Sequence, residues 1–163
     1  MNGPPFTKTF MAKKTVKIFL DSNVILSGLL SDRGAPRIIL DILSLRLPFI
    51  TAATGQYNLT EIERNIAKKL PEISDIYREY FPKIHCTVIP TPKKKDLRKC
   101  RGMISDKDLP VLISAMNFGA DFLVTGDKKD FAKLVSDDRL PFKIVSPSEL
   151  LNVIMTFLDY DLA

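Results

Sequence analysis

The chain alternates short apolar strands with helical segments, and this alternation constrains its fold more than any other feature. Val16–Leu20 is apolar apart from Lys17 and ends at Asp21, and Phe122–Val124 is a second apolar run that leads to Asp127. Strands without alternating polar residues are typical of parallel sheets covered on both faces. We therefore predict the α/β class, with a single three-layer α/β/α domain around a central parallel sheet.

The same patterns place the remaining elements. Further strands are predicted at 48–51, 86–89 and 142–145, and helices at 24–30, 37–46, 54–69, 72–80, 108–118, 128–134 and 147–158. Ser22 and Asn23 are expected to cap the first helix. We expect residues 1–14 to be a disordered lead-in and 15–163 to form the domain, since 163 residues suit one hydrophobic core. Without a signal peptide or a long apolar run, the expected compartment is the cytoplasm.

Four acidic residues are candidates for a common site. Asp21 and Asp127 follow strands, and Asp108 opens the helix that feeds the strand before Asp127. All three should lie at the carboxyl edge of the sheet, where ligands bind in folds of this class. Glu61 reaches that edge only if its helix packs across it. Clustered carboxylates repel one another unless a cation neutralises them, and Mg²⁺ and Mn²⁺ favour carboxylate oxygens.

Each acid also has a structural explanation. Asp108 could cap its helix, Asp127 could belong to a turn, and Glu61 could be a solvated helix charge. Asp21 is the hardest to explain in this way, because an acid directly after a buried strand costs free energy without a partner. The conjunction of the four, rather than any one of them, favours a cation site and phosphodiester chemistry.

Basic residues are concentrated in one stretch of a chain whose formal net charge is +5. Such a surface suits a polyanion, although a solvated basic surface explains the charge equally well when taken alone. We expect the stretch to bind the nucleic-acid backbone without sequence preference. Its candidate substrate-binding residues are Lys93, Lys94, Lys95, Arg98 and Arg101.

The order of the acid-bearing segments resembles the PIN-domain family over roughly 16–154, through the segments 19–25, 59–66, 108–115 and 119–131. The resemblance implies a PIN-like fold and a VapC-like, toxin-type endoribonuclease that depends on Mg²⁺ or Mn²⁺. It implies catalysis and metal binding by Asp21, Glu61, Asp108 and Asp127, with Asn23 and Thr125 in support. A metal-activated water would attack the phosphate of RNA and leave a 5′-phosphate and a 3′-hydroxyl. The implied partners are a small antitoxin protein and a second copy of the chain.

Several alternatives stay open at this point. Glu63 competes with Glu61, Asp106 competes with Asp108, and Asp130 is either a weaker fifth acid or a surface residue. The sequence does not fix the number of metal ions, the RNA target or the oligomeric state. A catalytically silent PIN module that binds RNA or protein as a scaffold is the alternative function, although such modules usually lack one or more of the acids.

Overall fold

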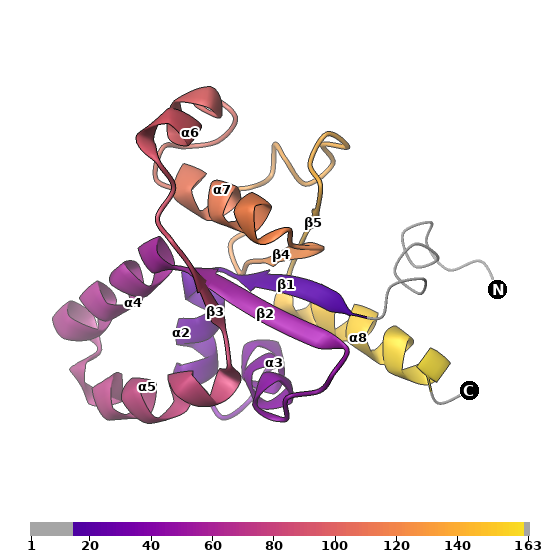
Figure 1. The fold of residues 1–163 in the computed structure, drawn as a ribbon. Coiled ribbons are helices and arrows are strands. Elements are labelled where there is room, and N and C mark those ends of the chain that lie inside the picture. Colours follow the sequence, from indigo (N-terminus) through magenta and orange to yellow (C-terminus); the bar gives the residue numbers. More distant parts are fainter. Residues whose placement is uncertain (1–14, 162–163) are drawn as a thin grey trace.

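A parallel sheet of five strands, in the order β3-β2-β1-β4-β5, runs through the centre of the computed structural model (Figure 1). The structure describes residues 15–161, so the lead-in predicted at 1–14 lies outside the described residues. The strands are β1 Val16–Leu20, β2 Ile50–Gly55, β3 Thr87–Ile89, β4 Phe122–Val124 and β5 Lys143–Val145. Each neighbouring pair is parallel. Helices flank this sheet on both faces, and the predicted α/β fold with a central parallel sheet is confirmed.

The helices form the two outer layers. They are α2 Ser22–Leu30, α3 Ala35–Ser44, α4 Gln56–Lys69, α5 Ser74–Tyr80, α6 Lys94–Lys99, α7 Leu109–Phe118 and α8 Pro147–Asp161, with 3₁₀ turns η1 Pro71–Ile73 and η2 Phe81–Ile84. Figure 1 shows α7 over one face of the sheet and α2, α3 and α8 beneath the other. No described helix combines the length and apolar character needed to cross a membrane.

Strand β1 divides the hydrophobic core into two clusters. Ile18 and Leu20 belong to the cluster shared with α2, α3 and α8, whereas Phe19 belongs to the cluster shared with α7. Successive strand side chains point to opposite faces, so a strand buried on both faces needs apolar residues at every position. All three side chains are fully buried, at 0% exposure. The apolar run Ile18–Leu20 therefore reflects a central position in the sheet, whereas Lys17 lies at the less buried start of β1.

Several predicted boundaries shift, among them the junction of β2 and α4, and one predicted helix is wrong. Strand β2 extends to Gly55, so α4 begins at Gln56, because Thr54 bonds the neighbouring strand through its hydroxyl to the Leu20 carbonyl (2.8 Å). The helix predicted at 128–134 is wrong, and this segment is a series of turns. Phe131 and Leu134 are both buried there and joined by a backbone bond three residues apart. Their spacing suits a turn as well as a helix.

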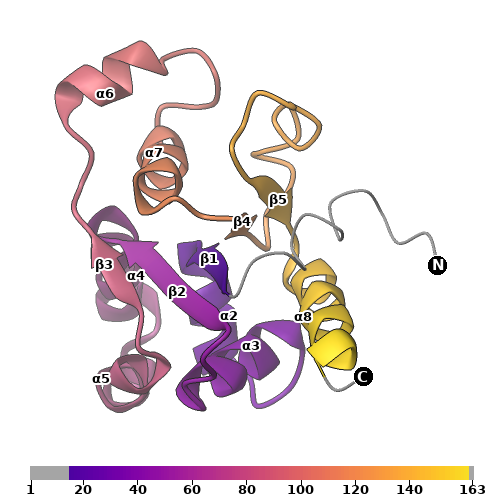
Figure 2. The same ribbon diagram turned by 45° about the vertical axis from the view of Figure 1, so that its right-hand side comes forward.

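The α6 helix has no counterpart among the predicted elements. It spans Lys94–Lys99, and none of its residues is buried. A short, charged segment lacks the apolar period on which helix prediction depends. It lies next to α7 (Figure 2) and carries most of the basic stretch.

Candidate functional site

Asp21 is the buried centre of the candidate site. It directly follows β1 and is 8% exposed. Its Oδ1 accepts hydrogen bonds from the Ser22 backbone N–H (2.8 Å) and from Asn58 Nδ2 (3.1 Å). Its Oδ2 accepts one from the Thr125 hydroxyl (2.9 Å). Since every one of these groups is a donor, these hydrogen bonds favour the ionised carboxylate and oppose the effect of its burial.

The first of these bonds also caps α2. The prediction that Ser22 and Asn23 cap this helix is wrong, because the cap is Asp21, whose carboxylate accepts from Ser22 N–H. The Ser22 and Asn23 side chains are thereby free for contacts within the site.

Burial is the main influence on the charge state of Asp21. It raises the pKa of this carboxyl to about 6 from 3.8, while the Thr125 and Ser22 hydrogen bonds act in the opposite direction. The negative charges of Glu61 and Asp108 raise the same pKa further. Asp21 therefore carries a net electrostatic penalty at neutral pH, which a bound cation would relieve.

Glu61 approaches Asp21 through Ser22. Its Oε2 accepts a hydrogen bond from the Ser22 hydroxyl (3.1 Å), and Ser22 is buried beside Asp21. Glu63, two residues along α4, instead accepts from the Tyr77 hydroxyl (3.2 Å) on α5. Residues two apart on a helix do not share a face. Glu61 is therefore the glutamate on the Asp21 side of α4.

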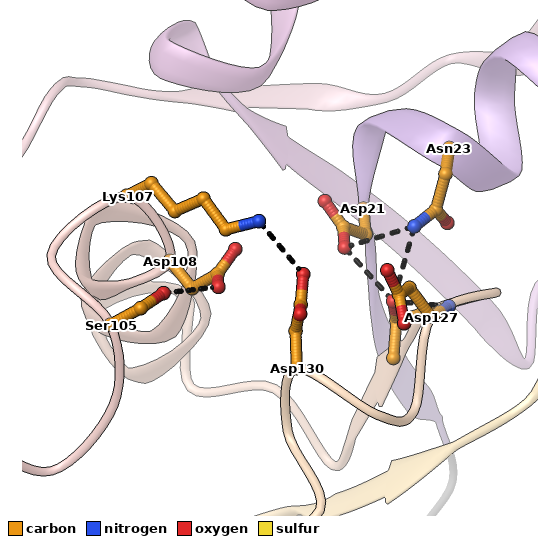
Figure 3. A network of polar contacts seen from close by, with 8 residues as sticks. Asp21, Asn23, Ser105, Lys107, Asp108, Asp127 and Asp130 are labelled. Atoms are coloured by element: carbon orange, nitrogen blue, oxygen red, sulfur yellow. Dashed lines mark hydrogen bonds and ion pairs between the residues drawn. The ribbon is translucent and has the colours of Figure 1, made fainter.

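Asp108 and Asp127 face the same space as Asp21 (Figure 3). Asp108 precedes α7, but its side chain makes no capping hydrogen bond and accepts instead from the Ser105 hydroxyl (2.5 Å). Capping therefore does not account for this carboxylate. Asp127 is exposed, and its backbone N–H donates to Thr125 Oγ1 (3.2 Å). The competing Asp106 is also exposed.

Asn23 and Thr125 connect the ends of the two central strands. Asn23 Nδ2 lies 3.3 Å from Thr125 Oγ1 and 3.5 Å from Asp21 Oδ2. Asn23 Oδ1 accepts from the Gly126 backbone N–H (2.8 Å). The β1–β4 pairing places Leu20 beside Val124, which brings these polar residues together just beyond the strands.

Two further charged residues, Lys107 and Asp130, lie near the acids. The sequence suggested Asp130 as a weaker fifth acid or a surface residue, and it did not suggest Lys107. The Lys107 ammonium lies 3.1 Å from Asp130 Oδ2 and points into the space bordered by Asp108 and Asp127 (Figure 3). The hydrogen bond to Asp130 raises the pKa of Lys107, and the charges of Asp108 and Asp127 act in the same direction. Sequence offered no signal for this ion pair beyond the position of Lys107 before Asp108.

The arrangement is a spread group of oxygen donors. Asp21 and Glu61 meet through Ser22, whereas the Lys107 ammonium pairs with Asp130 in the space that Asp108 and Asp127 face. Within residues 15–161, no three acidic, histidine or cysteine side chains gather closely enough to form a ready-made cation site. The donor chemistry nevertheless fits a hard divalent cation, because carboxylate oxygens are the groups that Mg²⁺ and Mn²⁺ prefer.

The basic stretch lies apart from the acids on the α6 side of α7. Its five predicted substrate-binding residues are exposed: Lys93, Lys94, Lys95, Arg98 and Arg101. Because α6 packs on α7, these charges are carried next to the helix that Asp108 precedes.

Comparison with known proteins identifies the family. The model of the PIN domain matches residues 17–129, which spans all four candidate acids. The chain belongs to the PIN-domain family. No curated protein matches this PIN-domain chain.

Two solved structures share the fold. VapBC2 from Rickettsia felis, bound to a DNA fragment from its promoter, aligns with a TM-score of 0.60 at 17% identity, over 80% of this chain and 98% of that one. VapBC-1 from nontypeable Haemophilus influenzae aligns with a TM-score of 0.55 at 18% identity, over 82% and 99% of the two chains. The predicted resemblance to VapC-like PIN domains is thus confirmed at the level of the fold.

Proposed function

We propose that this PIN-domain protein is an endoribonuclease that depends on Mg²⁺ or Mn²⁺ and hydrolyses RNA phosphodiester bonds. The observation that carries the proposal is the environment of Asp21. This carboxylate is buried and accepts hydrogen bonds from Thr125, Asn58 and the Ser22 backbone, at the sheet edge where Asp108 and Asp127 also lie. A buried charge is expensive unless it is paired or coordinates a metal. Family membership supports a nuclease in general terms.

Asp21, Glu61, Asp108 and Asp127 are the proposed catalytic residues and metal ligands. When bound, the cation would lower the pKa of a water molecule and polarise a phosphoryl oxygen. The chain itself supplies orientation, because Thr125 and Asn58 fix the two oxygens of Asp21. The exposed basic residues of α6 would bind the RNA backbone through charge.

A toxin role is the finer part of the proposal. The likeness of fold to the two VapBC structures supports this role. The proposal includes control by a small antitoxin protein, a homodimeric state and a cytoplasmic location. An open reading frame for a small protein directly upstream, whose product co-purifies with this chain and stops cleavage, is the expected finding. Activity that no such partner changes would remove the toxin role and leave the nuclease proposal intact.

The decisive experiment is cleavage of a mixed RNA pool in the presence of Mn²⁺. We expect cleavage by the wild type, and loss of cleavage with EDTA or in Asp21→Asn. Asp32→Asn is the matched control, since this aspartate has a side chain 90% exposed and lies eleven residues after Asp21. Equal cleavage by Asp21→Asn and the wild type would refute the site, and RNA binding without cleavage or metal binding would favour the silent scaffold.

A further inference from the structure

We propose that Asn58 is a positioning residue, whose side-chain amide holds Asp21 and Glu61 in a fixed relation to each other. The inference rests on the proposed function, because it concerns how the acids of that site are held. Asn58 lies in the first turn of α4 and is completely buried, at 0% exposure. It was not among the residues that the sequence suggested.

The donors of the Asn58 amide are directed at the acids. Nδ2 donates to Asp21 Oδ1 (3.1 Å) and to Ser22 Oγ (3.0 Å). The Ser22 hydroxyl has one proton to donate. Its oxygen lies 3.1 Å from Glu61 Oε2 and 3.4 Å from the backbone carbonyl oxygen of Asn58, so Glu61 is the nearer acceptor. One amide therefore contacts one carboxylate directly and the other through a single hydroxyl. The two acids come from different elements, the end of β1 and the helix α4.

The opposite end of the amide explains its orientation. A reversed amide would place its oxygen against the Asp21 carboxylate, where both groups are acceptors, so the donors must face the acids. Asn58 Oδ1 accepts no hydrogen bond from any residue in the described part of the chain, and Ser114 Oγ nearby is likewise unpaired there. A buried acceptor without a partner costs free energy. This cost is balanced by the two hydrogen bonds that Nδ2 donates to Asp21 and Ser22.

Gly55 makes the space for this oxygen. A Cβ at residue 55 would lie 2.8 Å from Asn58 Oδ1 and 3.2 Å from Ser114 Oγ. The first distance is too short for a carbon atom, so any side chain there must displace the amide. Gly55 has a φ of −93°, which other residues adopt freely, so backbone conformation does not require glycine here. Glycine is needed because the Asn58 side chain fills the space that a side chain at residue 55 would occupy.

The principal test is the Mn²⁺ affinity of metal-free Asn58→Ala protein, measured by calorimetry beside the wild type. Removing a group that orients a metal ligand typically lowers metal affinity about 10–100-fold, and we expect a loss in this range. Ser114→Ala is the matched control, because Ser114 is equally buried and has no hydrogen bond to an acid. Gly55→Ala should shift affinity in the same direction as Asn58→Ala, since its methyl group displaces the amide without removing it.

Kinetics separate positioning from a general loss of structure. In Asn58→Ala we expect a lower kcat at limiting Mn²⁺, an unchanged KM for RNA, and recovery of kcat as Mn²⁺ is raised. A damaged fold would show in the circular dichroism spectrum of the metal-free variant, which should instead match that of the wild type. Wild-type affinity and kcat in Asn58→Ala would overturn the proposal.

A metal-free measurement keeps this inference distinct from the proposed function. Hydrogen exchange of the Asn58 side-chain amide should accelerate in Glu61→Ala, which removes the acceptor of Ser22. It should stay unchanged in Glu63→Ala, whose glutamate contacts Tyr77 instead. If the wild type neither binds Mn²⁺ nor cleaves RNA, the proposed function fails, and this exchange measurement decides the positioning role alone. Equal exchange in Glu61→Ala and the wild type would overturn it.

Discussion

Replacing Asp21 with asparagine should stabilise the metal-free protein at neutral pH, although it should abolish cleavage. Burial raises the pKa of Asp21 from 3.8 to about 6. A shift of roughly 2 units costs about 3 kcal/mol once the group is ionised, at about 1.4 kcal/mol per unit. Asparagine avoids this cost but offers one acceptor fewer to Thr125 and Asn23, a loss of about 1 kcal/mol. We therefore expect the free energy of unfolding of metal-free Asp21→Asn to exceed that of the wild type by about 2 kcal/mol.

The gain should depend on pH in a defined direction. Because the folded pKa is raised, Asp21 contributes its full stability below about pH 3.8, and that contribution is lost as pH rises through about 6. The advantage of Asp21→Asn should thus be small near pH 4 and complete above about pH 7. For a chain of this size it corresponds to a rise in Tm of about 4–8 °C.

Thermal unfolding in EDTA, followed by circular dichroism at several pH values, measures this effect. The control Asp32→Asn should show no comparable change, because its carboxylate is exposed. Adding Mn²⁺ should raise the Tm of the wild type, since a ligand that binds the native state raises its stability. The Tm difference between Asp21→Asn and the wild type should then narrow or reverse. A variant no more stable than the wild type at pH 7.5, or a gain that is the same at pH 4 and pH 7.5, would refute the reasoning.

Three further predictions concern the basic stretch, the ion pair and the core. Replacing Lys93, Lys94 and Lys95 by alanine should weaken RNA binding and reduce the slope of log affinity against log salt by about 2; an unchanged slope would exclude this surface. Lys107→Met should tighten Mn²⁺ binding in calorimetry, because it removes an ammonium that faces the acids, and weaker binding would contradict this role. Leu112→Ala, at a fully buried position, should lower the free energy of unfolding in urea by about 2–5 kcal/mol, whereas a loss below 1 kcal/mol would contradict tight packing there.

Local patterns were enough to predict the sheet and to select the acids. The apolar run of β1 and its terminal Asp21 are contiguous in the sequence, so strand, burial and acid could be inferred together. The acids at 108 and 127 likewise belong to a continuous helix–strand unit. The catalytic and metal-binding roles of these residues, and the supporting roles of Asn23 and Thr125, stay predictions.

Features that depend on tertiary contacts could not be predicted from the sequence. Asn58 reads in the sequence as one polar residue in the first turn of a helix, and its contact with Asp21 joins positions 37 residues apart. The choice between Glu61 and Glu63 depended in the same way on which neighbour each glutamate meets, Ser22 or Tyr77. Helix α6 was not predicted for a different reason: it is short and charged, none of its residues is buried, and it therefore shows no apolar period.

The hydrogen bond between Asp21 and Thr125 spans 104 residues of sequence, and its strands β1 and β4 are adjacent in the sheet. During synthesis, the first catalytic candidate leaves the ribosome long before the strand that completes its surroundings. Folding rates fall as contacts become more distant in sequence, so the pairing of β1 with β4, which brings Thr125 to Asp21, should form late. A nascent chain would therefore carry an incomplete site until most of the domain has emerged, and the proposed cleavage of RNA would start only after that point.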